Sequence, residues 1–235
     1  MNQAGSAEDQ SKGVTGEARR RVLLVDDHPF MRAGLALLID KQPDMVVAAE
    51  AGNPAEAMRV LASEQIDLIL SDITMPGRSG IDFIKDLQAT NPELPILVVS
   101  MHDETLYAER VLRAGARGYI MKEAGGENLL AAIRQVLRGQ TYVSARVSAQ
   151  FVDAMSGRRP RGSSSPIERL SDREFEIFQL VGQGKSTRDI AAQLNLSPKT
   201  VDVHRANIKE KLQLKDTTAL VRHAVRWVET QGRET

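Results

Sequence analysis

The chain has 235 residues, 42% of them hydrophobic, and its 31 basic and 31 acidic side chains give a formal net charge of zero. This composition excludes wholesale disorder and a globally cationic nucleic-acid binder. The lack of cysteine excludes disulfides and cysteine-based metal sites, and no apolar run approaches the roughly 18 residues that a membrane helix needs. Residues 1–17 are polar and lack the apolar core of a signal peptide. We therefore expect a cytoplasmic protein without a membrane partner.

Charge and composition divide the chain into two domains. Residues 1–157 carry 16 basic and 21 acidic side chains, whereas residues 167–235 carry 12 basic and 10 acidic. The stretch between them is rich in glycine, serine, proline and arginine, which is typical of a flexible linker. We expect a disordered lead-in over residues 1–19, a first domain over 20–140, a linker that is partly helical over 141–166, and a second domain over 167–230.

In the first domain, short aliphatic runs alternate with longer amphipathic segments. The runs are residues 22–25, 45–49, 66–70, 96–99 and 118–121. The segments with helix-like apolar spacing are residues 30–39, 54–62, 80–89, 104–114 and 127–137. Continuous apolar strands that alternate with helices indicate βαβ units and a parallel sheet covered on both faces. Five repeats in about 120 residues predict a flavodoxin-like, doubly wound α/β fold with strand order 2-1-3-4-5.

Polar side chains follow the predicted strands at the edge where a doubly wound sheet binds its ligands. The ends of the first, third, fourth and fifth strands carry, in that order, Asp26 with Asp27, Asp72, Ser100 and Lys122. Three ionised carboxylates cannot crowd together without a compensating cation, and an incomplete set of oxygen ligands suits Mg²⁺. A carboxylate beside that ion can accept a phosphoryl group, and a lysine can neutralise its charge. Each residue alone is more often a helix cap or a surface group, but their conjunction at one edge is specific.

The motifs around these residues resemble the receiver domain of bacterial two-component response regulators over residues 20–140. The matching stretches are Val22-Leu-Leu-Val-Asp26-Asp27-His28, Asp67-Leu-Ile-Leu-Ser-Asp72-Ile-Thr-Met-Pro76-Gly, Val98-Val-Ser100-Met-His and Gly115-Ala-Arg-Gly-Tyr119-Ile-Met-Lys122. The resemblance implies that a sensor histidine kinase phosphorylates Asp72. It also implies that Mg²⁺ is held by Asp26, Asp27, Asp72 and the backbone carbonyl of Thr74.

The same match identifies Ser100 and Tyr119 as a switch pair and Lys122 as a phosphoryl contact. A dianionic group on Asp72 would recruit the Ser100 hydroxyl, and the vacated space would let Tyr119 rotate inward. The alternative is that Ser100 caps a helix and Tyr119 is a half-buried core ring. Receivers often have a cis proline after this lysine, whereas Glu123 stands here. Because a cis bond is costly without proline, we expect a different loop geometry after Lys122.

The second domain shows helix signals and no strand-like alternation. The sequence predicts three helix starts: at the capping box Ser171-Asp-Arg-Glu174, at Ser186 with Asp189 in the first turn, and at Ser197-Pro198. Only Asn195 and Leu196 separate the second helix from the third. That turn is short enough for a helix-turn-helix.

The third predicted helix has two distinct sides when successive residues turn about 100°. The side that must face the core carries Val201, His204, Ile208 and Leu212. The opposite side carries Lys199, Asp202, Val203, Ala206 and Glu210. Small apolar groups among charges suit a recognition helix, because they can meet thymine methyls while polar groups read base edges. The alternative is a merely solvated amphipathic helix.

A second resemblance covers residues 167–230. The stretches Leu170-Ser-Asp-Arg-Glu174, Gly184-Lys-Ser-Thr-Arg-Asp-Ile190-Ala191, Thr200-Val201-Asp-Val-His204 and Ile208-Lys-Glu-Lys211-Leu212 resemble the LuxR-type helix-turn-helix of NarL/FixJ response regulators. It implies an all-α domain of four helices whose third helix enters the major groove. We predict DNA contacts at Lys199, Thr200, Asp202, Val203, Ala206, Asn207, Lys209 and Lys211. Asp202 and Ala206 depart from the lysines often found there, so the base sequence cannot be borrowed from relatives.

The last predicted helix, residues 216–229, is more apolar than one packed face needs. We predict that its surplus forms a two-fold dimer contact through Leu220, Val221, Ala224, Val225 and Val228. A dimer suits DNA half-sites about one helical turn apart.

Together these features predict a phosphorylation-controlled, sequence-specific DNA-binding regulator of transcription, with double-stranded promoter DNA and a second copy of the chain as partners. Its only chemistry would be its own aspartyl phosphorylation and dephosphorylation. We expect the unphosphorylated receiver to cover the recognition helix. One alternative is a Mg²⁺-dependent phosphatase, but Thr74 stands where such an enzyme needs a second carboxylate. Another is a receiver used only for dimerisation, which the intact set of polar strand ends disfavours.

Overall fold

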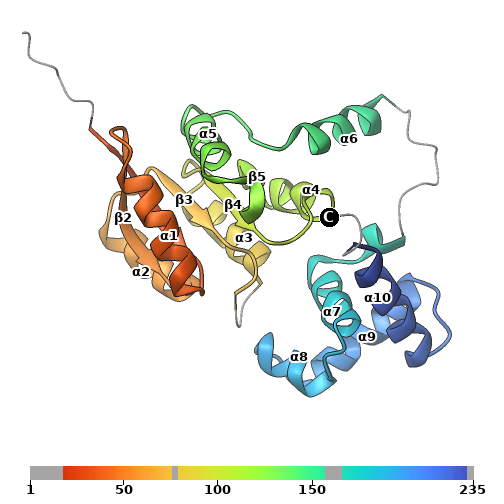
Figure 1. The fold of residues 1–235 in the computed structure, drawn as a ribbon. Coiled ribbons are helices and arrows are strands. Elements are labelled where there is room, and N and C mark those ends of the chain that lie inside the picture. Colours follow the sequence, from red (N-terminus) through yellow and green to blue (C-terminus); the bar gives the residue numbers. More distant parts are fainter. Residues whose placement is uncertain (1–17, 76–78, 157–165, 232–235) are drawn as a thin grey trace, which may run out of the picture.

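The computed structural model describes residues 18–75, 79–156 and 166–231. An α/β domain precedes a smaller helical domain (Figure 1). The lead-in expected over residues 1–19 and the linker expected over 141–166 lie largely or partly outside the described residues, which begin at residue 18 and exclude 157–165. Within the described residues, no helix has the length and hydrophobicity needed to cross a membrane.

Five parallel strands form the sheet of the first domain, in the order β2-β1-β3-β4-β5. They are β1 (Arg20–Val25), β2 (Met45–Ala51), β3 (Leu68–Ser71), β4 (Ile96–Ser100) and β5 (Gly118–Met121). Every residue of β3 and β4 is buried, as expected for inner strands covered on both faces. Strand order reverses between β1 and β3, so the chain leaves these two strands in opposite directions. The predicted doubly wound fold is confirmed.

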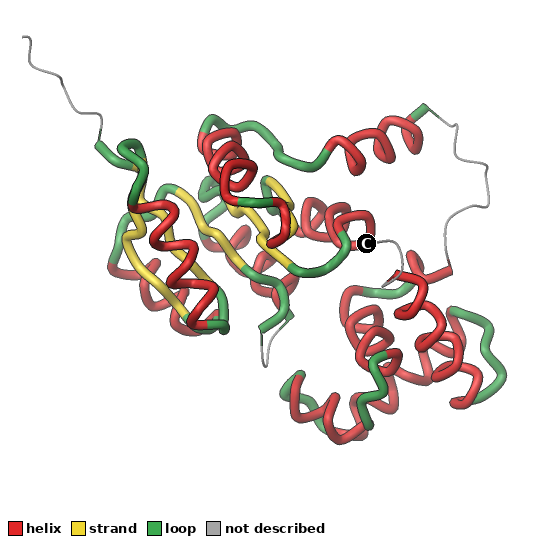
Figure 2. The backbone as a smooth tube through the Cα atoms, in the orientation of Figure 1, coloured by secondary structure: helices red, strands yellow, loops and turns green. Residues whose placement is uncertain are grey.

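Helices cover both faces of this sheet (Figure 2). They are α1 (Pro29–Asp40), α2 (Pro54–Ser63), α3 (Gly80–Thr90), α4 (Glu104–Ala114) and α5 (Gly126–Leu137). Side chains alternate along β1, so Val22 and Leu24 belong to the core on one face while Leu23 and Val25 belong to the core on the other. The first core lies under α1 and α5, and the second lies under α2, α3 and α4.

The rest of the described chain is helical. Its elements are α6 (Ala145–Met155), the 3-10 helix η2 (Pro166–Arg169), α7 (Asp172–Gly182), α8 (Thr187–Gln193), α9 (Pro198–Lys211) and α10 (Thr217–Gln231). The serines at the starts of α7 and α8 both form complete capping boxes, and Ser197 caps α9 with a proline in the first turn. These observations confirm the predicted starts of the three helices and the all-α class of the second domain.

Candidate functional site

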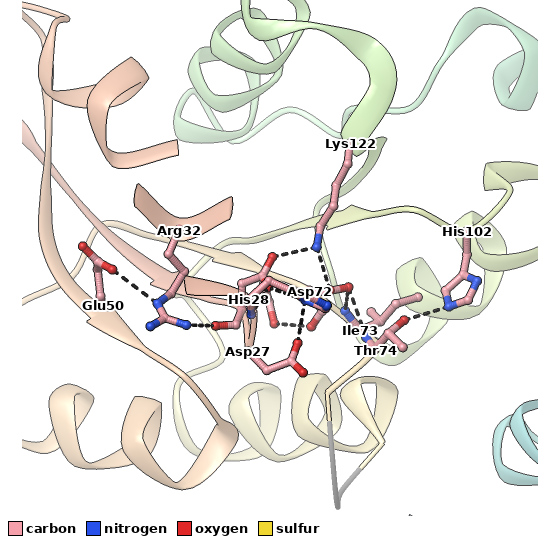
Figure 3. Close-up of polar contacts among 11 residues, drawn as sticks. Asp27, His28, Arg32, Glu50, Asp72, Ile73, Thr74, His102 and Lys122 are labelled. Atoms are coloured by element: carbon pink, nitrogen blue, oxygen red, sulfur yellow. Dashed lines mark hydrogen bonds and ion pairs between the residues drawn. The ribbon is translucent and has the colours of Figure 1, made fainter. Parts of the chain in front are cut away.

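Four side chains gather at the carboxyl edge of the sheet, at the ends of β1 and β3 (Figure 3). Ligand atoms of Asp26, Asp27, His28 and Asp72 all lie within 4.8 Å of one another. Asp26 and Asp72 are buried, whereas Asp27 is half-buried and His28 is exposed. The parallel sheet thus brings together the three carboxylates that the sequence placed at strand ends, and it adds an imidazole.

Lys122, which follows β5, lies between two of these carboxylates. Its ammonium donates hydrogen bonds to Asp26 Oδ2 at 2.6 Å and to Asp72 Oδ2 at 2.7 Å. Burial alone would lower the pKa of Lys122, but the hydrogen bonds to both carboxylates outweigh it, so the pKa is raised above its ordinary value. Lys122 therefore stays charged and compensates part of the acidic cluster.

The Asp72 carboxylate is held from both sides. Its Oδ1 accepts hydrogen bonds from the backbone amides of Ile73 at 2.6 Å and Thr74 at 3.1 Å, while Oδ2 faces Lys122. The loop after Asp72 also runs close to the start of α3. A Cβ on Gly80 would lie 2.4 Å from the Ile73 Cα, so only glycine fits there. The orientation of the Asp72 carboxylate is therefore fixed.

The residues present fit a magnesium ion. Asp27 Oδ1 is buried and receives no hydrogen bond of normal geometry, although His28 Nδ1 lies 2.9 Å away. A buried carboxylate oxygen without a hydrogen-bond donor can serve as a metal ligand, and hard oxygen ligands are those that Mg²⁺ prefers. Three carboxylates facing one lysine also leave a surplus of negative charge for a cation to balance. The backbone of Thr74, the fourth predicted ligand, lies beside Asp72.

The predicted switch residues are both fully buried. Ser100 Oγ accepts a hydrogen bond from the His102 amide at 3.2 Å, and the Tyr119 hydroxyl donates to the His102 carbonyl at 2.7 Å. Burial raises the pKa of Tyr119, so the phenol remains a donor. Tyr119 thus lies inward in the same structure in which Lys122 pairs with Asp72.

The loop after Lys122 continues without a cis peptide bond. Residues Lys122–Ala124 form a short 3-10 helix, η1, that leads into α5. No cis bond occurs among the residues that the structure describes. Glu123 therefore stands in a trans connection, and Lys122 still reaches the acidic cluster.

Sequence reasoning missed three side chains of the site. Arg32 donates to the Asp26 carbonyl and pairs with Glu50, which fixes the end of β1 (Figure 3). His28 contacts the carboxylates, and His102 Nε2 lies 2.7 Å from Thr74 Oγ1 in a hydrogen bond. Burial lowers the pKa of His102, with Asp72 opposing and Lys122 reinforcing the effect, so its ring is neutral near neutral pH. Both histidines stand inside the matched motifs, but their contacts have no local spacing signal.

Helix α9 presents the face expected of a recognition helix. Val201 and Ile208 are buried. Five of the predicted DNA contacts are exposed there: Lys199, Asp202, Val203, Ala206 and Asn207. Lys211 is exposed too, but it is paired with Glu174. Because these positions are exposed, the first domain does not cover this side of α9 in the structure. The receiver packs on α7 instead, through contacts described below.

The other three predicted DNA contacts have partners or partial burial. Lys211 donates to the buried Glu174 at 2.6 Å, so its ammonium is engaged within the domain. The Thr200 amide donates a hydrogen bond to Ser197 Oγ at 3.0 Å in the cap of α9. Lys209 is half-buried.

Helix α10 divides its predicted dimer residues between two environments. Leu220 and Ala224 are fully buried, and a Cβ on Gly182 of α7 would come within 2.5 Å of the Ala224 carbonyl oxygen. Val221 is 37% exposed, whereas Val225 and Val228 are half-buried. Two of the five residues therefore belong to the core of the helical domain, and Val221 is the exposed member of the set.

The fold and its acidic edge, joined to a helix-turn-helix, define a response regulator: a regulator of transcription whose receiver takes a phosphoryl signal and whose second domain binds DNA. The family described as "Response regulator receiver domain" matches residues 22–134, and "Bacterial regulatory proteins, luxR family" matches residues 168–224. The chain belongs to the two-component response regulators that combine these two domains.

Individual relatives agree with this membership over almost their whole length. "Oxygen regulatory protein NreC" of Staphylococcus haemolyticus is 35% identical over 210 residues, which cover 88% of this chain and 97% of that protein. The protein of the same name from Staphylococcus aureus (strain MRSA252) is 37% identical over 210 residues, with the same coverage. Among solved structures, RcsB from Salmonella enterica serovar Typhimurium, bound to promoter rprA with the phosphomimetic BeF3-, shares the fold at a TM-score of 0.64. It is 24% identical, over 88% of this chain and 99% of that one.

Proposed function

We propose that Asp72 accepts a phosphoryl group from a sensor histidine kinase, and that this change controls the binding of promoter DNA by α9. The observation that supports Asp72 is its fixed carboxylate, held by two backbone amides and by Lys122 beside two further carboxylates. The observation that supports α9 is its exposed face of small and charged side chains. Because the promoter DNA of bacteria lies in the cytoplasm, the protein would work there.

The transfer can be described from the kinase's phosphohistidine and the residues of this chain. An oxygen of Asp72 attacks the phosphorus of the kinase's phosphohistidine, a P–O bond forms, and the P–N bond breaks with its electron pair going to the imidazole nitrogen. The Lys122 ammonium, which pairs with the Asp72 carboxylate before transfer, would pair with the phosphoryl oxygens after it. A bound Mg²⁺, held by Asp26, Asp27, Asp72 and the Thr74 carbonyl, would neutralise charge on the transferred group. Water would later hydrolyse the acyl phosphate and restore Asp72.

On the DNA side, we propose that a dimer places two copies of α9 in successive major grooves. Lys199 and Lys209 would contact phosphates, while Asp202, Val203 and Ala206 would face the bases. Asp202 can accept a hydrogen bond from cytosine N4. The RcsB structure, which shares the fold, is bound to promoter DNA, and this supports the proposal.

The test compares the wild-type protein with Asp72→Asn and, as a control, Asp82→Asn, which alters an acid of α3 whose side chain is 43% exposed. Each protein is treated with acetyl phosphate and Mg²⁺, and the covalent phosphoryl group is measured by intact mass. We expect modification of the wild type and the control but not of Asp72→Asn. Operator duplexes selected from a random pool then report affinity in both states. Modification of Asp72→Asn, or equal affinities with and without phosphorylation, would refute the proposal.

The phosphatase alternative finds little support in the structure. The residue two positions after Asp72 is Thr74, and its hydroxyl is bonded to His102 rather than offering a general acid. Hydrolysis of small phosphoesters that disappears in Asp72→Asn would bring this alternative back.

A further inference from the structure

Helix α7 of the DNA-binding domain packs against α4 of the receiver through aromatic and charged contacts. The Tyr107 hydroxyl donates to Gln179, and its ring lies 5.2 Å from the Phe175 ring. Arg110, one turn further along α4, places its guanidinium 4.5 Å over the Phe175 ring and donates to Asp172 at 3.1 Å. Phe175 is thus held between two side chains of α4. The contact joins the receiver to the first two turns of α7.

Tyr107 also contacts the loop that leaves the phosphorylation site. Its ring stacks on His102, with centroids 4.8 Å apart and an angle of 23° between the planes. His102 is bonded at three points: its ring to Thr74, its amide to Ser100 and its carbonyl to Tyr119. The position of His102 therefore depends on the residues that surround Asp72.

The aromatic contacts of Phe175 continue to α10. The Phe175 ring lies 5.6 Å from the Trp227 ring, nearly edge to face at 80°. We call His102, Tyr107, Phe175 and Trp227 the aromatic chain. It runs without interruption from the loop after β4, through α4 and α7, to the helix whose exposed Val221 is a predicted dimer residue.

We propose that the aromatic chain transmits the phosphorylation state of Asp72 to α10, with Tyr107 as the positioning residue that joins the two domains. This inference rests on the proposed function. It differs from uncovering a blocked recognition helix, because the base-facing side of α9 is already exposed. The receiver would act on the geometry of the dimer helix.

The local chemistry supplies the two states that such coupling requires. When the Ser100 hydroxyl donates a hydrogen bond to a phosphoryl oxygen, Ser100 Oγ is drawn away from the His102 amide. In this structure Ser100 Oγ accepts a hydrogen bond from that amide. The segment 100–102 then shifts, and His102 moves relative to Thr74 and to the Tyr107 ring. A cavity of about 70 Å³ borders Thr74, His102 and Tyr107, so the segment that carries His102 has room to move. Close-packed rings have few alternative positions, so a shift of one displaces the next.

Other contacts between the domains are less suited to this role. Lys85 pairs with Asp172 at 2.8 Å, but its side chain is 50% exposed, so solvent and salt weaken the pair. Arg110 also donates to the carbonyls of Leu170 and Ile167, so it anchors the segment that leads into α7. Tyr107 contacts both the loop of the phosphorylation site and the rings of α7.

The chain offers a direct probe, because Trp227 is its single tryptophan. The experiment measures tryptophan emission of the full-length protein before and after addition of beryllium fluoride and Mg²⁺. We expect a change in the wild type that falls about threefold or more in Tyr107→Leu, in the range of coupling lost when one residue between two sites is altered. The matched control is Tyr142→Leu, which removes a phenol packed on the opposite core of the sheet. It should keep the wild-type response.

A parallel measurement of acetyl phosphate labelling separates the possible failures. If Tyr107→Leu is labelled normally and keeps the wild-type emission change, or if labelled wild-type protein shows no change, the coupling is refuted while the proposed function stands. If wild-type protein is not labelled, the proposed function itself falls. Gln179→Leu leaves the receiver intact and removes the partner of the Tyr107 hydroxyl, so it must also reduce the response, even if Tyr107→Leu does not fold.

Discussion

Two lysine–carboxylate contacts, one in each domain, show how differently the same chemistry is used. Lys122 is 4% exposed and donates to two carboxylates that are equally buried. Lys211 is 39% exposed and donates to one buried carboxylate, Glu174. The first contact belongs to a cluster whose charges cannot be solvated separately. The second ties a largely exposed helix to the helix beneath it.

This difference predicts where substitutions act. Removing one partner from a buried charge cluster leaves the others uncompensated and costs about 3–5 kcal/mol. Removing one from a partly exposed pair costs about 1 kcal/mol or less, because water replaces the lost contact. In the receiver site, a single substitution should therefore disturb the whole charge cluster. On the surface of α9, a single substitution should remove only the contact of the residue that is replaced.

The largest effect is expected for Lys122→Met. Without the ammonium, the carboxylates of Asp26 and Asp72 face each other unpaired, so the free energy of unfolding should fall by about 3–5 kcal/mol in Mg²⁺-free buffer. Added Mg²⁺ should stabilise the variant more than the wild type, since the cation replaces the missing charge. Urea denaturation with and without Mg²⁺ measures both quantities.

Lys85→Met is the control for this experiment, because it removes an exposed lysine from an ion pair with Asp172. It should change the free energy of unfolding by less than about 1 kcal/mol and leave the Mg²⁺ dependence unchanged. Equal losses in the two variants would contradict the view that Lys122 belongs to a coupled buried cluster.

A glycine in each domain gives the next largest contrast. A Cβ on Gly182 would lie 2.5 Å from the Ala224 carbonyl oxygen and 2.6 Å from Val228 Cγ2, so Gly182→Ala must push α10 away from α7. We expect it to lower the free energy of unfolding by about 1–3 kcal/mol. Gly34→Ala in α1 meets nothing within 4 Å and should stabilise its helix by about 0.5–1 kcal/mol. Thermal unfolding distinguishes the two signs.

The third prediction concerns Lys211→Met and its dependence on pH. Burial alone would raise the pKa of Glu174, but hydrogen bonds from Lys211 and Ser171 outweigh it and hold the pKa below its ordinary value of 4.5. A carboxyl whose pKa is lowered on folding adds stability above 4.5, and this stability is lost as the pH falls through the folded value. Lys211→Met should therefore lose about 1 kcal/mol near neutral pH, a figure kept low because Lys211 is 39% exposed.

The loss should shrink below pH 4.5, where protonation of Glu174 removes the contact in the wild type as well. Urea denaturation across this range provides the measurement. A destabilisation that stays constant down to the acid limit would show that the Lys211 stem, rather than its charge, supports α9.

The acidic edge was predictable because parallel strands bring their carboxyl ends to one side. The apolar runs located β1, β3 and β5, and the sheet topology then placed Asp26, Asp72 and Lys122 together without any knowledge of side-chain contacts. Helix starts were predictable for a similar reason. A capping box such as that of Ser171 and Glu174 is satisfied within four residues.

The remainder depends on contacts between distant segments. Lys211 was predicted as a DNA contact, but no local pattern could show that Glu174, 37 residues earlier, holds its ammonium. Nor could a local pattern show that α4 contacts α7 through Tyr107, so the packing of the first domain on α7 was not predicted. The inward position of Tyr119 likewise depends on the carbonyl of His102. Local patterns say which side of a helix faces inward, whereas tertiary packing decides what it meets.

The smallest effect separates two lysines of α9 that look alike in sequence. Lys199 is exposed and forms no ion pair within the described part of the chain, so Lys199→Gln should remove one phosphate contact and lower the slope of log affinity against log salt by about 0.9. Lys211→Gln should change the slope less, because the Lys211 ammonium is already neutralised by Glu174. Titration of an operator duplex at several salt concentrations measures both slopes. If Lys211→Gln lowered the slope as much as Lys199→Gln, Lys211 would have to leave Glu174 on binding DNA. The Lys211–Glu174 ion pair would then be exchanged for a phosphate contact rather than kept in the complex.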